Sequence, residues 1–521
     1  MRRLILVWFA SYLSICILEL GLLALLTRYK PQYKTILFLL HVIIISTLFF
    51  FISYLFIFNT AIDEQMYLFI LRTNLYEVWD FLTTQVPFLV YLLYALFVII
   101  LAYTYYLFTQ ATLSLHTYTI VGIIGLGGVL SIIIFLLSTP MLRFSPLIIT
   151  ARNAYGIFTG KITHVVRGNA QEHSQYLQDT RPYLYVVIIG ESVTRLAWNA
   201  YGYYRNTTPF ISSQLQNPSY ILMNNVFAPS KYTDVSVPYM LSSMSQYTST
   251  NAKEAVSLLD ILNNAGIHTV WISNQIQYEN TKMNMEIRFV VEYAKEHYWL
   301  RKGNTKAWRD DAVQDEILSI IKKYQDNTQP TAIFIHLYGS HFDFCQRYNK
   351  ELYTVFTSHP QHAVSSTHAE DINCYDNSIY ATDQLLESIT KELEKNPNFA
   401  LLTYISDHGE GIYLDKKRVD PNSTPDVLQI PFYLYIRENY RKHYPTIVNN
   451  LKSNINRGFT ADMLFDTLIG IFKIKADLYT PTYDISSEHY SYSYETLKTF
   501  SGTQYVKDIY KEQGAVSKVE K

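Results

Sequence analysis

The stretch YLYVVIIGESVTRLAWNAYGYYRNTTP, from Tyr183 to Pro209, decides the fold of this chain. It begins with an apolar, β-branched run, Tyr185–Ile189, which does not alternate with polar residues and therefore predicts a strand buried on both faces. The strand ends at Gly190, and Glu191 follows at once. A buried carboxylate is costly unless it is paired, and the carboxyl ends of strands in an open α/β sheet are where ligands bind. We therefore expect Glu191 to face a cation.

Two regimes of composition divide the 521 residues. Residues 1–142 are almost continuously apolar, whereas the composition after about residue 160 is that of a globular protein. A membrane-spanning helix needs about 20 apolar residues. The segments that reach this length are Leu4–Leu26, Ile36–Phe58, Val86–Phe108 and Tyr118–Leu137. We expect a transmembrane domain of about four helices at 1–142, a linker at 143–182 and a globular domain at 183–521.

Charge bears on both the orientation and the partners of the chain. Arg28, Lys30 and Lys34 lie between the first two apolar segments, which favours a cytoplasmic loop there and places the globular half on the outer side. The net charge is −1 and the pI about 6.9, so nothing indicates a nucleic-acid partner. In an outer compartment Cys345 and Cys374 could form a disulfide, and the sequence leaves this open.

The loop at 59–85 has apolar residues at helical spacing and could lie as amphipathic helices along the membrane surface. Thr73, Asn74 and Glu77 fall on about one face of such a helix. One carboxylate and two neutral polar groups could hold a cationic lipid head group. A solvated helix face explains the same spacing, and from the spacing alone it is the simpler interpretation.

After Tyr183 the chain alternates between buried strands and helical patterns. The expected strands are Tyr185–Ile189, His268–Ser273, Thr331–His336, Ala400–Ile405 and Pro431–Ile436. The expected helices are Leu258–Ala265, Ala312–Gln325, Tyr380–Lys395 and Ala461–Phe472. Strands separated by helices predict an α/β fold with a mostly parallel central sheet.

Polar groups follow several of these strands. Asp407 and His408 come directly after the fourth strand, and carboxylate oxygen with imidazole nitrogen suits zinc. His341 follows the third strand and could bind phosphate or move a proton. Thr233 and Ser236 are candidate nucleophiles, because a metal that lowers the pKa of a hydroxyl makes it reactive. Each residue also has an ordinary structural explanation, but their gathering at strand ends favours one site.

Taken together, these motifs resemble the phosphoethanolamine transferases of Gram-negative bacteria, which are membrane enzymes of the alkaline phosphatase/sulfatase superfamily. The matching stretches run in the family's order: VVIIGES with YGYYRNTTP, YTDVSVP, WISNQ, IHLYGSH, YDN and ISDHGE. The pattern of Thr73, Asn74 and Glu77 also occurs in that family, which turns the interpretation of this loop towards a lipid-binding site.

The resemblance implies a fold, a site and an activity. The fold is an N-terminal transmembrane helical bundle followed by an alkaline phosphatase/sulfatase-like α/β domain in the periplasm, anchored in the inner membrane. The implied zinc ligands are Glu191, Thr233, Asp407 and His408, with Thr233 as the carrier of phosphoethanolamine and His341 near the phosphoryl group. The donor is phosphatidylethanolamine, and the acceptor is a lipopolysaccharide core heptose or lipid A.

Two departures from the family pattern leave questions open. The segment STPDVLQIP carries Asp426 where the family usually has a histidine, so one or two zinc ions are both possible. Pro229 and Tyr239 stand where some members have cysteines, which places the chain nearer the cysteine-poor branch that modifies core sugars.

Alternative functions are a membrane-anchored sulfatase or phosphodiesterase, a glycerol-phosphate transferase, and a non-catalytic scaffold. The TDVSVP segment lacks the C/S-x-P-x-R setting of sulfatases.

Overall fold

The computed structural model divides the chain into two compact units, Met1–Ile162 and Thr163–Lys521. The residues that it describes are 33–58, 82, 86–110, 168–247, 255–275, 285–301, 308–361, 363, 365–412, 425–500 and 502–512. The loop at 59–85 with Thr73, Asn74 and Glu77 lies outside this set almost entirely, as do the expected spans Leu4–Leu26 and Tyr118–Leu137.

The first unit contains two long helices, α2 (Tyr33–Phe58) and α5 (Phe88–Gln110), which coincide with two of the expected spans. They contact each other through Phe49 and Phe97, whose rings stack with centroids 4.7 Å apart. Judged on the described residues alone, no helix is long and apolar enough to cross a membrane. The transmembrane domain at 1–142 thus stays a prediction.

The second unit is built on a seven-stranded sheet in the order β3-β9-β8-β2-β7-β5-β6. Five neighbouring strands, β8, β2, β7, β5 and β6, run parallel, while β9 is antiparallel to both of its neighbours. The sheet is therefore mixed, with a parallel centre. The bounds are β3 Tyr220–Leu222, β9 Phe432–Ile436, β8 Phe399–Ser406, β2 Leu184–Gly190, β7 Thr331–His336, β5 His268–Ser273 and β6 Glu296–Trp299.

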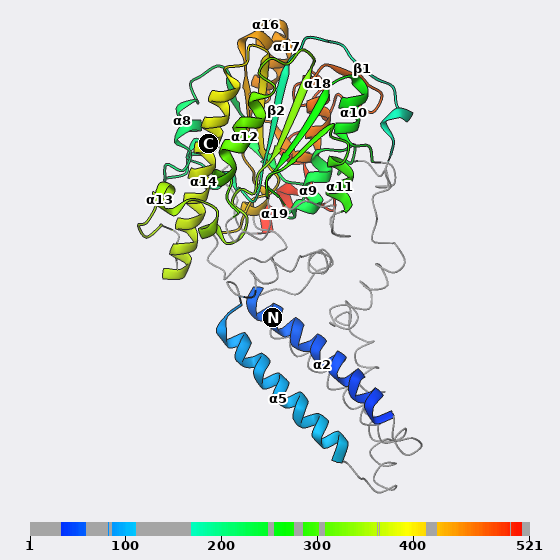
Figure 1. Ribbon diagram of the computed structural model, residues 1–521, viewed down its shortest axis with the longest axis vertical. Coiled ribbons are helices and arrows are strands. Elements are labelled where there is room, and N and C mark those ends of the chain that lie inside the picture. Colours follow the sequence, from blue (N-terminus) through cyan, green and yellow to red (C-terminus); the bar gives the residue numbers. More distant parts are fainter. Residues whose placement is uncertain are drawn as a thin grey trace. The chain divides into compact units, whose positions relative to one another are not determined.

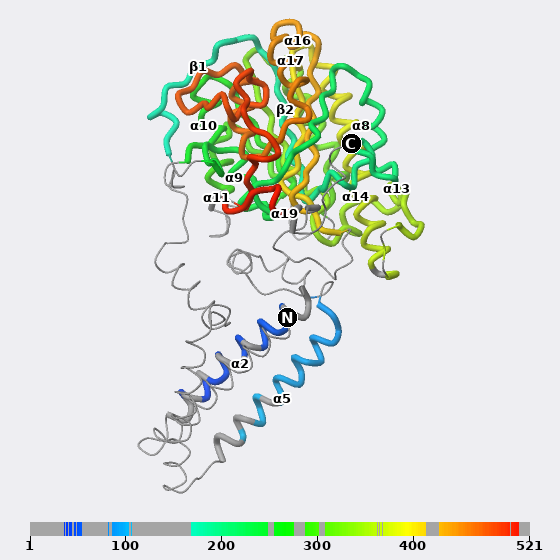
Figure 2. Tube along the Cα trace, turned by 180° about the vertical axis from the view of Figure 1, so that it is seen from behind, coloured from blue at the N-terminus to red at the C-terminus, as the bar shows by residue number. Residues whose placement is uncertain are grey.

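Both faces of the sheet are covered, as the lack of alternation in β2 predicted. Every residue of β2 is buried. Alternate side chains of the strand enter two separate cores, with Val187 in one and Val186 in the other. Figure 1 shows α8 (Pro209–Ser213), α12 (Gln314–Lys322) and α14 (Ser366–Leu393) on one side, and α10 (Leu258–Ala265), α11 (Met285–Val291) and α18 (Leu464–Ile471) on the other. Figure 2 shows the same division from behind.

The five expected strands are all present, each to within a residue or two of the expected bounds. Three helix predictions needed correction. The third helix starts at Ser366 instead of Tyr380, because Ser365 caps it by accepting a hydrogen bond from the His368 backbone N–H. The other two begin as short 3₁₀ turns, at Asp311–Val313 before α12 and at Ala461–Met463 before α18. The three- and four-residue strands β3 and β6 were missed because they are too short to show a pattern.

Two links fix the segments that follow the strands. Cys345 and Cys374, whose pairing the sequence left open, form a disulfide between the loop after β7 and α14. Arg205 forms an ion pair with Asp376 of α14 at 2.7 Å, with both side chains buried. This pair ties the YGYYRNTTP segment to α14.

Candidate active site

The sheet register brings the ends of three strands to one edge. Gly190 of β2 is paired with Ser406 of β8, and Ile189 with His336 of β7. The residues that follow these strands therefore leave the sheet side by side, although they are far apart in the sequence. The chemistry of the site depends on this parallel arrangement.

Glu191 is 1% exposed and lies directly after β2. Its Oε1 accepts a hydrogen bond from the Ser192 hydroxyl at 2.8 Å, and its Oε2 accepts one from Gln275 Nε2 at 3.4 Å. Its backbone carbonyl accepts a hydrogen bond from the Ser340 N–H at 3.0 Å. Gly339, with φ of +53°, packs so closely that a Cβ there would lie 2.6 Å from the Glu191 carbonyl oxygen. The carboxylate is thus held from several sides and turned into the protein.

Asp407 and His408 follow β8, and their outer atoms are oriented by the backbone. Asp407 Oδ1 accepts the N–H groups of Ser192 at 3.1 Å and of His408 at 2.7 Å. Asp407 Oδ2 is buried and has no hydrogen-bond partner among the described residues. His408 Nδ1 lies 2.7 Å from the Gly409 carbonyl oxygen and so donates to it, which leaves Nε2 unprotonated in the neutral ring. Nε2 faces Glu191 Oε1 at 3.3 Å and Asp407 Oδ2 at 3.6 Å.

Thr233 brings a second hydroxyl to this cluster, in addition to that of Ser192. It is the first residue of α9 (Thr233–Met240). Its Oγ1 lies 3.1 and 3.0 Å from the two carboxylate oxygens of Glu191 and 3.3 Å from His408 Nε2. The alternative nucleophile, Ser236, is fully buried and donates to the Ser230 carbonyl at 3.0 Å. The structure therefore brings Thr233, and not Ser236, to the cluster.

The electrostatics of the cluster favour a bound cation. Burial alone would lower the pKa of His408, but the carboxylates of Asp407 and Glu191 outweigh burial and raise this pKa to about 10. Burial and repulsion from Glu191 together raise the pKa of Asp407 to about 6. Both shifts have one cause, because two carboxylates share a buried space with too little positive charge. A divalent metal ion would supply that charge.

The donor set fits zinc. Glu191, Asp407 and His408 each offer one ligand atom, and these atoms lie within 4.8 Å of one another. Carboxylate oxygens and an imidazole nitrogen are common zinc ligands, and the fixed Nδ1–H of His408 is the usual arrangement for a zinc-binding histidine. A metal ligand role also accounts for the partnerless Asp407 Oδ2, which is otherwise costly to bury.

His341 lies beside this cluster and not within it. Its Nδ1 is 3.3 Å from the Tyr338 hydroxyl. Burial lowers the pKa of His341 to about 3, and the positive charges of Arg347 and His408 add to the shift, so the imidazole is neutral. Asp426 belongs to a short helix, Pro425–Leu428.

His336 was missed as a candidate. This last residue of β7 is fully buried, and neither ring nitrogen has a partner among the described residues. Burial lowers its pKa to about 4, and the charge of Asp407 opposes that shift. A histidine that ends an otherwise apolar strand was the one signal in the sequence that could have marked it.

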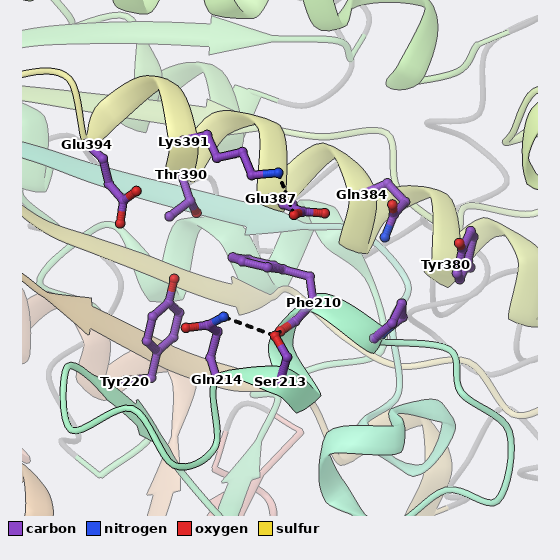
Figure 3. Close-up of a pocket in the computed structure, with 11 residues that line it drawn as sticks. Phe210, Ser213, Gln214, Tyr220, Tyr380, Gln384, Glu387, Thr390, Lys391 and Glu394 are labelled. Atoms are coloured by element: carbon purple, nitrogen blue, oxygen red, sulfur yellow. Dashed lines mark hydrogen bonds and ion pairs between the residues drawn. The ribbon is translucent and has the colours of Figure 1, made fainter.

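A groove lies on the α14 side of the sheet, apart from the residues described above. It has a volume of about 470 Å³ and lies between α8, Tyr220 and the C-terminal half of α14 (Figure 3). Lys391 and Glu387 form an ion pair on its wall at 2.6 Å.

The fold and the strand-edge cluster define an alkaline phosphatase-like α/β domain with a metal-binding arrangement of side chains. The sequence profile of the Sulfatase family matches residues 184–474, which is more than half of the chain, and the chain belongs to that family.

Named relatives are phosphoethanolamine transferases. The chain is 26% identical over 314 residues to phosphoethanolamine transferase EptC of Escherichia coli, with 58% of this chain and 52% of that protein covered. It is 28% identical over 317 residues to EptA of Helicobacter pylori, with 58% and 56% covered. The aligned part thus spans little more than half the length of these relatives.

Solved structures show the same fold. The periplasmic domain of E. coli EptC, which was also solved in complex with zinc, superposes with a TM-score of 0.55 at 24% identity, covering 62% of this chain and 91% of that one. The integral membrane protein EptA of Neisseria meningitidis superposes with a TM-score of 0.66 at 19% identity, covering 92% of this chain and 97% of that one.

Proposed function

We propose that this chain is a zinc-dependent phosphoethanolamine transferase that carries the group on Thr233. The observation that carries the proposal is the position of Thr233 Oγ1, 3.0 to 3.3 Å from Glu191 and His408 and at the start of a helix. A hydroxyl becomes a nucleophile when a neighbouring group lowers its pKa. A metal ion held by Glu191 and His408 would be such a group for Thr233. The activity of the named relatives at 26% and 28% identity supports the same reaction.

In this proposal Glu191, Asp407 and His408 hold one zinc ion beside Thr233. When bound, zinc lowers the pKa of the Thr233 hydroxyl and stabilises negative charge on the phosphoryl oxygens. The zinc complex of the E. coli EptC domain supports this choice of metal. Two further histidines, His336 and His341, lie near Asp407, and the zinc content of the purified protein distinguishes one bound ion from two.

The chain's own residues then perform a two-step transfer. Thr233 Oγ attacks the phosphorus of phosphatidylethanolamine, the bond from phosphorus to diacylglycerol oxygen breaks, and the hydroxyl proton of Thr233 ends on that oxygen. In the second step a hydroxyl of the acceptor attacks the same phosphorus and the bond to Thr233 breaks. Thr233 is the first residue of α9, so a phosphoryl group carried on it would lie at the positive end of the helix dipole. His341 moves the proton of the acceptor hydroxyl.

The proposal also names the donor lipid and the acceptor of the transferred group. Thr73, Asn74 and Glu77 would hold the amine of phosphatidylethanolamine at the outer surface of the inner membrane. The acceptor would be a lipopolysaccharide core heptose or lipid A in the periplasm. The long apolar segments in residues 1–142 support a membrane anchor, with 183–521 as the periplasmic catalytic domain.

The test uses the full-length protein in vesicles that contain phosphatidylethanolamine labelled in its head group. The wild type should become covalently labelled and pass the label to added lipopolysaccharide. Thr233→Ala should abolish both signals, and Thr233→Ser should restore part of them. Ser236→Ala is the matched control, because it removes a buried hydroxyl that donates to a backbone carbonyl instead of facing the cluster.

Each alternative function predicts a different outcome of the same assay. Covalent labelling followed by release of free phosphoethanolamine would identify a phosphodiesterase. Unchanged donor choice in Glu77→Gln would favour a glycerol-phosphate transferase. Protein that holds no zinc and takes no label would indicate a scaffold. If Thr233→Ala still modified lipopolysaccharide, the proposed intermediate would be wrong.

A further inference from the structure

One aromatic side chain makes two different contacts with His341. The Tyr338 ring stacks on the imidazole, with centroids 4.9 Å apart and planes 29° from parallel. The Tyr338 hydroxyl lies 3.3 Å from His341 Nδ1. Because only Gly339 and Ser340 lie between them, both contacts form within one short loop. The stack fixes the plane of the imidazole, and the hydrogen bond fixes which edge points to Tyr338.

Tyr338 is in turn fixed by groups outside the loop. Its backbone N–H donates to Asp310 Oδ1 at 2.9 Å, and the N–H of Gly339 donates to Asp310 Oδ2 at 2.7 Å. The rings of Trp308 and Tyr338 are nearly perpendicular, with centroids 5.2 Å apart, and the Arg347 guanidinium lies 4.8 Å from the centroid of the Tyr338 ring. The residue is 3% exposed. A side chain held in this way has little freedom to lose when it orders its neighbour.

The direction of this hydrogen bond decides which nitrogen of His341 keeps its lone pair. A neutral imidazole carries one N–H and one lone pair. Burial, Arg347 and His408 keep the ring neutral by lowering its pKa to about 3. The contact between the Tyr338 hydroxyl and Nδ1 allows either group to donate, and where Nδ1–H donates to the Tyr338 oxygen the lone pair is at Nε2. In His408 the direction is fixed, because its Nδ1 faces the Gly409 carbonyl, which can only accept.

We propose that Tyr338 is a positioning residue that holds His341 with its Nε2 lone pair ready to take the proton of the acceptor hydroxyl. The inference rests on the proposed function and deepens it for the second half-reaction. In that step the bond between acceptor oxygen and phosphorus forms, and the bond between Thr233 Oγ and phosphorus breaks. The acceptor's proton moves to Nε2 and returns through solvent to the Thr233 oxygen.

The test separates the two half-reactions in the full-length, zinc-loaded protein. An aryl ester of phosphoethanolamine serves as donor, because its leaving group needs no proton. Tyr338→Phe keeps the stacked ring and removes the hydrogen bond. It should keep the stoichiometric burst of aryl alcohol and slow the following steady state by about tenfold or more, within the roughly 10²–10⁴-fold that general base catalysis supplies. Labelled protein should accumulate.

Three comparisons make the result specific. His341→Gln should show the same pattern, and the double variant should be no slower than His341→Gln alone. Tyr435→Phe is the matched control, because it removes a tyrosine hydroxyl that donates to Glu394 at 2.6 Å, on a different strand. It should change neither phase. A readout independent of turnover is the ¹⁵N shift of the His341 ring in metal-free protein, which should report Nδ1–H in the wild type and mixed tautomers in Tyr338→Phe.

Two outcomes would overturn the inference. A loss of the burst together with the steady state would mean that Tyr338 only supports the fold of the site. Kinetics of Tyr338→Phe equal to those of Tyr435→Phe would mean that the hydroxyl has no part in transfer. Neither outcome would be confused with failure of the proposed function, because that failure appears as unlabelled wild-type protein or as an active Thr233→Ala variant.

Discussion

Replacement of Gly339 by alanine tests whether the loop after β7 positions Glu191. Gly339 has φ of +53°, and a Cβ built there lies 2.6 Å from the carbonyl oxygen and 2.9 Å from the nitrogen of Glu191. Both are backbone atoms, so no side-chain rotation can relieve the contact. Either the loop or Glu191 must move, and Glu191 is one of the three side chains whose ligand atoms lie within 4.8 Å of one another.

Gly339→Ala should lower the free energy of unfolding for two reasons. The left-handed backbone costs an alanine about 1–2 kcal/mol. Forcing an extra methyl group into packed surroundings costs about 1–3 kcal/mol more. Gly202 is the matched control, because it has φ of +97° and nothing within 4 Å of the added Cβ. Gly202→Ala should therefore lose only the first part, whereas Gly339→Ala should lose about 2–5 kcal/mol of unfolding free energy.

The functional consequence should be larger than the loss of stability suggests. A displacement of about 1 Å in a catalytic group can cost roughly 10²-fold in rate. Gly339→Ala should therefore lose zinc on dialysis and slow transfer to a similar extent, while Gly202→Ala keeps both. Urea unfolding, zinc content and transfer from labelled phosphatidylethanolamine measure the three quantities. Equal zinc retention and transfer in the two variants would refute the idea that the loop holds Glu191 in place.

Three further predictions follow from buried charges. Asp407→Asn removes the partnerless anionic Oδ2 and should weaken zinc binding, measured with a competing chelator dye, by more than the roughly 10–100-fold that loss of an outer hydrogen-bond partner costs. Arg205→Met removes the cation that faces the buried Asp376 carboxylate, which keeps a neutral donor in the Tyr203 hydroxyl, and should cost about 3–5 kcal/mol in urea unfolding, whereas the exposed Arg181→Met should cost far less. Burial, with repulsion from Asp484 and Asp462, raises the pKa of Asp466 to about 8. The unfolded carboxyl titrates near 3.9, so the folded state binds the proton more tightly. The contribution of Asp466 to stability should be fully present below about pH 4 and fall by roughly 1 kcal/mol per pH unit up to about pH 8. Asp466→Asn should remove this slope.

Much of the globular unit was predictable from local pattern. The apolar runs at Tyr185–Ile189 and Thr331–His336 identified buried strands because such runs carry their own burial signal. The polar groups after each run identified the edge at which a site would form, because strand ends in a parallel sheet meet there. Short elements were less predictable. The strand Tyr220–Leu222 has three residues, and the early start of α14 at Ser366 depends on a cap and not on apolar spacing.

The sequence by itself determined the alternation of strands and helices, the strand-end motifs and the set of groups able to hold a metal ion. Only the tertiary structure decided that Thr233 and not Ser236 faces Glu191, that His336 lies buried near Asp407, and that Tyr338 stacks on His341. The physical reason is the separation along the chain of the residues that interact. Strand and helix signals are carried by neighbouring residues, whereas distances of about 3 Å between side chains from different strands depend on sheet register and on packing across the whole domain.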